Sequence, residues 1–357
     1  MTAATTVRDL IDRLEEDREL SLEQWERVFK EWTEEDRLYA AEKARRTALE
    51  NFGNKIYIRG IVEFSNICKN DCLYCGIRAS NKEVSRYRLT EEEILQCCDE
   101  GYGYGFRTFV LQSGEDRYFT AEILAGIVRK IKAAHPDCAV TLSVGELGYD
   151  EYKLLKEAGA DRYLLRHETA DKEHYGRLHP PQMSWEHRMR CLEQLMELGY
   201  QVGAGIMVGS PYQTERCLAE DMVFLGSFKP HMIGIGPFLP HKDTPFRDMP
   251  KGPYELTLFL LSLCRLMLPR VLLPATTALG TIRPNGREQG VLCGANVIMP
   301  NLSPTAVRKK YMLYDNKICT GDESAQCRSC LERRMAAIGY EVAITRGDHH
   351  DKICDIR

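Results

Sequence analysis

The chain of 357 residues is long enough for one large domain with attachments, and 44% of its residues are hydrophobic, so it can bury a sizeable core. Its net charge of −4 argues against binding nucleic acid through bulk electrostatics. With no apolar run of about 18 residues and no signal-peptide pattern, we expect a cytoplasmic protein with neither a membrane nor a nucleic-acid partner.

The first 53 residues are predicted to form helices. Apolar residues recur at helical spacing from Val7 to Leu14 and from Trp25 to Trp32, while Glu and Arg fill the opposite face. Gly53 is typical of a helix C-terminus, and the pattern changes after it. We therefore expect three parts: an N-terminal helical extension (1–53), a barrel domain (54–310) and a C-terminal segment (311–357).

From residue 55 onward, short apolar or β-branched runs alternate with helical patterns. This alternation predicts a parallel sheet with right-handed crossovers, and eight such units predict an α/β fold, a (β/α)8 TIM-type barrel. Six units in a partial barrel with a separate cap would look nearly the same. The C-terminal segment is expected to close the lower end or the flank of the barrel. The predicted strands are 56–64, 108–112, 140–143, 163–165, 202–207, 232–235, 272–275 and 295–299.

Unusual polar motifs follow most of these strands. Ser65–Cys68 follows the first strand, Ser113–Asp116 the second and Arg166–Glu168 the fourth. Because barrels of this type carry their active sites on the loops after the strands, we expect these motifs to meet at one end of the barrel.

Three cysteines after the first strand have the spacing C-x3-C-x2-C: Cys68, Cys72 and Cys75. Three thiolates can each bind one iron of a 4Fe–4S cube, and the fourth iron then keeps an open position. A zinc site is the alternative, but structural zinc usually takes four N or S ligands, and no His or fourth Cys stands nearby in the sequence. The spacing therefore favours a 4Fe–4S cluster.

A second set of cysteines lies near the C-terminus: Cys319, Cys327 and Cys330. It predicts a second iron–sulfur cluster, 2Fe–2S or 4Fe–4S, with a zinc knuckle or unligated thiols as alternatives. The other cysteines are expected to be structural, because free Cys is often buried. The polar stretch from Asp348 to Asp351 contains two histidines, but we expect it to be a solvated tail.

The cysteine motif after the first strand resembles the hallmark of the radical S-adenosylmethionine (SAM) superfamily. Phe64 to Gly76 looks like the branch that holds biotin synthase, methylornithine synthase and the FeFe-hydrogenase maturase HydE. The resemblance implies that the amino and carboxylate groups of SAM chelate the open iron, and that an electron from the cluster generates a 5′-deoxyadenosyl radical. It covers roughly residues 50 to 335, and the segments most similar to HydE are 162–169, 203–209, 234–241, 274–281 and 294–301.

The same resemblance implies a set of SAM contacts. Glu168 and Arg188 match the pair that holds the ribose and the carboxylate of SAM, and the chemistry agrees, since a carboxylate suits sugar hydroxyls and an arginine fork suits a carboxylate. A salt bridge from Glu168 to Arg166 and a surface helix charge at Arg188 are the alternatives. The other implied contacts are Tyr74 near the adenine, Gly114 and Glu115 near the methionine amino group, and Ser143.

The resemblance also implies a substrate cavity inside the barrel. Its residue types, two cations, several hydroxyls and a thioether, suit a small anionic substrate. Met299 would also fit an ordinary core, whereas an arginine on a barrel strand must face water, a partner or a ligand. The implied lining residues are Arg59, Thr141, Arg166, Thr276, Thr277, Met299 and Tyr311.

By resemblance, we expect a radical SAM enzyme that acts in assembling the active site of FeFe hydrogenase. The implied substrate is a small organometallic iron species, and the implied partners are other hydrogenase maturases and an electron donor. A methylornithine synthase-like mutase is the alternative within the superfamily, and a non-catalytic iron–sulfur carrier or scaffold is the alternative outside it.

Overall fold

The computed structural model describes residues 5–318 and 328–351. Its largest sheet has six parallel strands in the order β2-β3-β4-β5-β6-β8, so neighbouring strands in the sheet follow one another along the chain. Val110 of β3 pairs with Thr141 of β4, and Leu142 of β4 pairs with Tyr163 of β5. The strands are β2 (Gly60–Ser65), β3 (Thr108–Ser113), β4 (Ala139–Ser143), β5 (Arg162–Leu164), β6 (Gln201–Ala204) and β8 (Met232–Ile233).

The ring closes through β1 (Lys55–Ile58), β10 (Val297–Ile298) and the predicted seventh strand. In that seventh position Leu272 bridges to Met232 and Pro274 bridges to Val297. β10 then pairs with β1, which leads directly into β2. The bridges stay isolated in part because Pro274 has no N–H to donate to a ladder. All eight predicted strand positions therefore lie in one ring, which confirms the (β/α)8 prediction.

Three predicted strand positions are each divided into two short strands, and the first of them contains β1 and β2. The fifth position contains β6 and β7 (Met207–Val208), and the sixth contains β8 and β9 (Gly236–Pro237). The division of the fifth and sixth positions coincides with a close approach of two backbones: Gly205 has φ +156°, and a Cβ there would lie 2.0 Å from the carbonyl oxygen of Gly234. After this crossing, β7 and β9 pair with each other and extend the barrel toward its carboxyl end.

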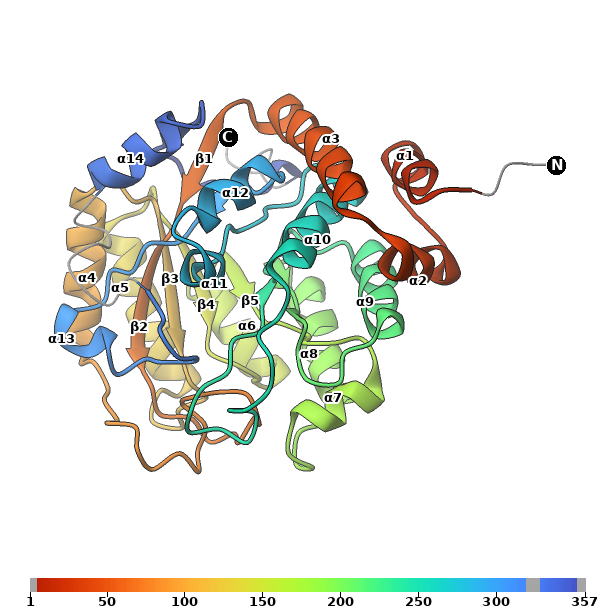
Figure 1. The fold of residues 1–357 in the computed structure, drawn as a ribbon. Helices are drawn as coiled ribbons and strands as arrows, with labels where there is room; N and C mark the ends of the chain where they lie inside the picture. The colour runs from red at the N-terminus through yellow and green to blue at the C-terminus, as the bar shows by residue number, and fades with distance from the viewer. Residues whose placement is uncertain (1–4, 319–327, 352–357) are drawn as a thin grey trace.

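Helices cover the outside of the ring (Figure 1). Most begin at a Thr, Ser or Asp whose side chain accepts a hydrogen bond from the first turn, as at Thr90, Thr120 and Thr214. The helices that follow the strands are α4 (Glu91–Gly103), α5 (Ala121–Ala134), α6 (Tyr149–Glu157), α7 (Lys172–Leu178), α8 (Trp185–Glu197), α9 (Glu215–Phe228), α10 (Tyr254–Met267), α11 (Thr277–Ile282), α12 (Gly286–Leu292) and α13 (Thr305–Arg308).

Three helices precede the barrel: α1 (Val7–Asp17), α2 (Leu22–Glu31) and α3 (Glu34–Phe52). Each begins with a capping box, in which the N-cap residue and the residue three positions later exchange hydrogen bonds. α3 packs on α10 and α2 packs on α9, so the extension covers one side of the barrel (Figure 1). Within the described residues, none of the helices is long and apolar enough to cross a membrane.

The C-terminal segment closes the amino end of the barrel. After α14 (Arg328–Ala336), β11 (Glu341–Ala343) pairs in parallel with β1, and the chain then crosses beneath the strands. Asp348 and His349 are only 8% and 7% exposed. The expectation of a solvated tail was therefore wrong: Asp348 accepts hydrogen bonds from Arg162 and Gln201 inside the barrel, and two partners on adjacent strands hold the tail there.

Candidate active site

The loop that carries Cys68, Cys72 and Cys75 follows β2 and has no regular secondary structure. Hydrogen bonds from side chains hold the loop in place of the backbone hydrogen bonds of a helix or a sheet. Arg86 donates hydrogen bonds to four carbonyl oxygens of the loop and its surroundings, and Asp71 binds Arg78 through two bonds of 2.6 and 2.7 Å. The loop is thereby held in one conformation, although it consists of turns.

The three thiols of this loop are half-buried, and none forms a disulfide. Burial and then the charge of Cys68 raise the pKa of Cys75 to about 12, and burial together with the other two thiols raises the pKa of Cys72. At neutral pH these thiols are therefore protonated unless a metal group binds them. Among the described residues, no three Cys, His, Asp or Glu side chains converge on a single metal ion. Three thiols on one loop suit a cluster, in which each thiolate binds a different iron.

Gly114 and Glu115 lie against the cysteine loop. The backbone N–H of Glu115 points to Cys68 Sγ at 3.4 Å. A Cβ at Gly114 would lie 2.3 Å from the carbonyl oxygen of Ile67 and 2.8 Å from Cys68 Cβ, so only glycine fits there. The Glu115 carboxylate accepts a hydrogen bond from the N–H of Glu146, which joins the loops after β3 and β4.

Glu168 lies at the end of β5 in a left-handed conformation with φ +66°. Its N–H donates to the Gly205 carbonyl, and the preceding His167 is fully buried against Asp221 of α9 at 3.2 Å. The carboxylate is 8% exposed, and its Oε2 has no partner among the described residues. No ion pair with Arg166 forms, so that alternative is wrong. A strained residue with an unpartnered buried acceptor is typical of a ligand site.

Arg188 projects inward from α8 and is 6% exposed, so the surface-charge alternative is wrong. Its Nε donates to Glu146 at 2.5 Å and its Nη1 donates to the Arg166 carbonyl at 2.5 Å. Its Nη2 makes no hydrogen bond to the described residues. Glu146 therefore orients the guanidinium while leaving one N–H group for a ligand.

Tyr74, between Cys72 and Cys75, is joined to α7 by a hydrogen bond from its hydroxyl to His179 at 3.2 Å. Burial lowers the pKa of His179 to about 3, with Arg188 as the next cause, so the imidazole is neutral and can accept this bond. Ser143 lies half-buried at the end of β4, where it pairs in register with Gln112. The structure thus gathers the implied SAM contacts at the carboxyl end of β2 to β5.

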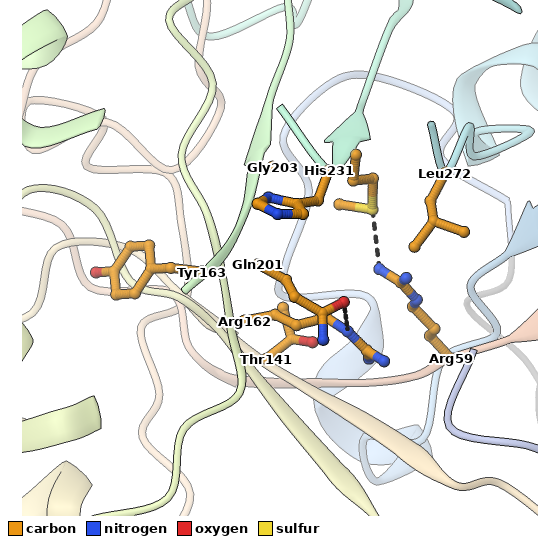
Figure 2. Close-up of a pocket in the computed structure, with 9 residues that line it drawn as sticks. Arg59, Thr141, Arg162, Tyr163, Gln201, Gly203, His231 and Leu272 are labelled. Atoms are coloured by element: carbon orange, nitrogen blue, oxygen red, sulfur yellow. Dashed lines mark hydrogen bonds between the residues drawn. The ribbon is translucent and has the colours of Figure 1, made fainter. Parts of the chain in front are cut away.

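The implied substrate-pocket residues divide between two levels of the barrel. Arg59 and Thr141 line a small cavity of about 10 Å³ at the amino end, where their side chains face Arg162 and Gln201 (Figure 2). Arg59 Nε and Thr141 Oγ1 are buried without a partner among the described residues. Met299 packs on the apolar cluster that includes Met232 and Leu272 beside this cavity.

The other implied pocket residues lie nearer the carboxyl end. Arg166 follows β5 and lies close to Gly234. Thr276 and Thr277 begin α11, and Thr276 Oγ1 is also unpartnered. Tyr311 is buried, and its hydroxyl accepts a weak hydrogen bond of 3.4 Å from Gln112.

A family model described as Radical SAM superfamily matches residues 62–225. The chain is 48% identical to the FeFe hydrogenase maturase subunit HydE of Thermotoga maritima, over 80% of this chain and 82% of HydE. This chain belongs to the radical SAM superfamily. Its predicted resemblance to HydE is confirmed by that identity.

One further sequence relative and two solved structures are also similar to this chain. The 3-methylornithine synthase of Methanosarcina barkeri is 30% identical, over 86% of this chain and 85% of the synthase. The crystal structure of methylornithine synthase (PylB) matches with a TM-score of 0.83 and 26% identity, over 94% and 97% of the two chains. The structure of the maturase HydG, with a TM-score of 0.79 and 20% identity, shares the fold over 96% of this chain and 77% of HydG. The protein is therefore a radical SAM enzyme.

The superfamily implies a 4Fe–4S cluster and SAM, and the residues at the carboxyl end fit both groups. Cys68, Cys72 and Cys75 offer a cluster three thiolates on a braced loop. Glu168 offers SAM an unpartnered buried carboxylate, and Arg188 offers an uncommitted N–H group. The buried Glu168 Oε2 remains without a partner among the described residues, which is costly in a buried site unless a ligand donates to it.

The second cysteine set falls largely outside the described residues. Cys319 and Cys327 lie in 319–327, which the structure does not describe. Cys330 lies half-buried on α14, where Arg333 donates to its Sγ at 3.2 Å. The second cluster therefore stays a prediction.

Three residues near the implied SAM site were not predicted to have a role there: Glu146, Tyr175 and His179. Glu146 had a usable signal, because it follows a predicted strand at the carboxyl end. Tyr175 and His179 had none, because Tyr175 lies on the short helix α7, His179 directly follows it, and spacing alone cannot assign the inward face of so short a helix.

Proposed function

We propose that Cys68, Cys72 and Cys75 hold a 4Fe–4S cluster and that Glu168 and Arg188 hold SAM beside it, in an enzyme that acts in FeFe-hydrogenase maturation. The observation that carries the proposal is the placement of an unpartnered carboxylate and an inward-facing arginine beside three braced thiols. Tyr74, Gly114, Glu115 and Ser143 are proposed as the remaining SAM contacts, since they lie at the same end of the barrel.

A reduced cluster of this type supplies the electron that cleaves the sulfonium bond of SAM, which yields methionine and a 5′-deoxyadenosyl radical. The protein's own residues position SAM and keep water away. Glu168 accepts hydrogen bonds from the ribose hydroxyls, and Arg188 binds the carboxylate through the N–H group that Glu146 leaves uncommitted. Burial of both side chains excludes water, which protects a reactive carbon radical from side reactions.

The role in hydrogenase maturation is supported by the 48% identity to HydE, against 30% to methylornithine synthase. We propose a small anionic or organometallic iron compound as the substrate, taken up inside the barrel, and other maturases and an electron donor as partners. Arg59 is buried at the amino-end cavity and its Nε has no partner among the described residues, so it suits an anion, whereas Arg162 beside it is already paired with Asp348. Cys319, Cys327 and Cys330 are proposed to hold an accessory iron–sulfur cluster.

An assay of reductive SAM cleavage distinguishes the proposed enzyme from a non-catalytic iron–sulfur carrier or scaffold. The reconstituted protein, incubated anaerobically with dithionite and SAM, is expected to release 5′-deoxyadenosine. A protein that binds iron and sulfide but leaves SAM intact would contradict the proposal. Formation of 3-methylornithine in the same assay, with an isomeric amino acid added, would favour the methylornithine synthase alternative over a role in maturation.

Replacing Glu168 with Gln is expected to weaken SAM binding by roughly 10- to 100-fold, since hydrogen bonds to a charged group contribute about 1.5–3 kcal/mol. Glutamine keeps the shape and the Cβ, so the strained backbone is not further disturbed. Equilibrium dialysis with the oxidised, cluster-loaded protein measures the affinity. Glu193→Gln, on the exposed face of α8, is the matched control and should bind SAM as the wild type does. Unchanged affinity in Glu168→Gln would contradict the assignment.

A further inference from the structure

Tyr175 is held rigidly beside the implied SAM site. It lies on α7, is 1% exposed, and its ring stacks on His179 with centroids 3.9 Å apart. His179 Nδ1 lies 2.9 Å from the Tyr175 carbonyl oxygen, which can only accept, so Nδ1 carries the proton. His179 Nε2 therefore accepts from the Tyr74 hydroxyl. The His179 ring thus connects Tyr175 to the cysteine loop in one orientation.

The hydroxyl of Tyr175 has no partner among the described residues although it is buried. Burial raises the pKa of Tyr175, Arg188 opposes this effect, and Glu146, Cys72 and Glu168 reinforce it. The hydroxyl is therefore neutral and able to donate a hydrogen bond. Leaving a buried hydroxyl without a partner costs about 1–3 kcal/mol, so this position favours a ligand that can accept a hydrogen bond.

The hydrogen bonds of Arg188 indicate which chemical group of a ligand would fit at this position. A guanidinium only donates hydrogen bonds, and Arg188 already uses Nε for Glu146 and Nη1 for the Arg166 carbonyl. Helices α7 and α8, which carry Tyr175 and Arg188, pack on each other, and neither the Tyr175 hydroxyl nor Arg188 Nη2 has an acceptor among the described residues. Two donors are joined most favourably by an anion with several lone pairs, and a carboxylate has about four such positions.

We propose that Tyr175 is a further SAM-binding residue whose hydroxyl donates to the SAM carboxylate together with Arg188 Nη2. This inference rests on the proposed function, because it requires SAM at the site. Tyr175 also positions Tyr74 through His179, so one aromatic residue on α7 connects the methionine end of SAM to the cysteine loop.

The test compares Tyr175→Phe with the wild type as oxidised, cluster-loaded proteins. Phenylalanine keeps the stacking on His179 and removes only the hydroxyl. SAM affinity in equilibrium dialysis is expected to fall about tenfold, the equivalent of one lost hydrogen bond to a charged group. Affinity for 5′-deoxyadenosine, which lacks the carboxylate, should stay within about twofold of wild type. The KM for SAM should rise in the cleavage assay while kcat changes less.

A purely structural role makes a different prediction for the ligand-free protein. Removing an unpartnered hydroxyl is expected to leave the Tm without SAM unchanged or raised, whereas a structural tyrosine would lower it. Tyr340→Phe is the matched control, since its hydroxyl is also buried without a partner among the described residues but Tyr340 directly follows the C-terminal helix α14. That variant should bind SAM as the wild type does.

Three outcomes would overturn the inference: wild-type SAM affinity in Tyr175→Phe, a lowered ligand-free Tm that accounts for the loss, or an equal loss of 5′-deoxyadenosine affinity. The last would mean that the hydroxyl contacts the nucleoside and not the carboxylate. If Glu168→Gln loses affinity while Tyr175→Phe does not, this inference alone fails. If the wild type neither binds nor cleaves SAM, the proposed function fails with it.

Discussion

The Cys72→Ala variant is expected to lose SAM cleavage almost completely. Cys72 is one of three thiols on a loop that Arg86 and Asp71 brace, so no other cysteine can move into its place. Removing even an outer partner of a metal site typically costs about 10- to 100-fold in affinity or activity, so we expect loss of a direct ligand to cost more than 100-fold. The measurements are 5′-deoxyadenosine release and iron content after anaerobic reconstitution.

Cys97→Ala is the matched control for this prediction. Cys97 is also a free thiol, but it is buried on α4 and away from the loop. It should keep the iron content and the SAM cleavage of the wild type. Iron that remains in Cys72→Ala would report the accessory cluster proposed at Cys319, Cys327 and Cys330. Wild-type cleavage by Cys72→Ala would refute the cluster assignment.

The arrangement of the barrel could be predicted because its periodicity is local. Alternating strand and helix patterns marked all eight strand positions, and the loops after them carried the polar motifs. The interruptions could not be predicted. β6 and β7 are divided where Gly205 meets the Gly234 backbone, and that contact joins residues whose proximity appears only after folding. The isolated bridge between Pro274 and Val297 could not be predicted either, because it depends on two segments that become neighbours only in the folded protein.

The candidate site could be predicted where spacing or resemblance marked a residue, as for Cys68 and Glu168. The residues that hold the site residues in place could not be predicted. His179 matters because its Nδ1 is bound by a carbonyl one turn earlier, which leaves Nε2 for Tyr74. Asp221 matters because α9 places it under His167, next to the left-handed Glu168. Both depend on packing between elements, and a sequence pattern contains no distance across an interface.

The C-terminal tail is a second case in which the sequence pattern could not reveal a contact between distant elements: it predicted exposure, and the tail is buried. Asp348 to Asp351 is polar, and polarity alone predicts a solvated tail. The barrel interior reverses this expectation, because the buried Arg162 requires a counter-charge, and Asp348 supplies it at 2.6 Å. Arg346 also binds Asp348 at 2.7 Å, which ties the tail to itself as well as to β5. A polar segment is therefore buried where it neutralises a cation that the strands already hold.

The Asp348→Asn variant is expected to lose about 3–5 kcal/mol of unfolding free energy at pH 7, because removing one partner of a buried ion pair leaves the other charge uncompensated. Burial alone would raise the pKa of Asp348, but the charge of Arg162 and the bonds from Arg346 and Gln201 outweigh it and hold the pKa below its usual value. A carboxylate with a depressed folded pKa contributes stability above its unfolded pKa of about 3.9 and loses it as pH falls further.

Urea unfolding at pH 7 and at a series of pH values below 4 measures both parts of this prediction. The wild type should lose stability as the pH falls through this range, and Asp348→Asn should lose less, since its side chain does not titrate there. Asp248→Asn is the control, because its ion pair with Arg247 is exposed and such pairs contribute only about 0–1 kcal/mol. Equal stability of Asp348→Asn and the wild type at pH 7 would mean that Arg162 does not need this partner, and that the tail is held by β11 and not by its charge.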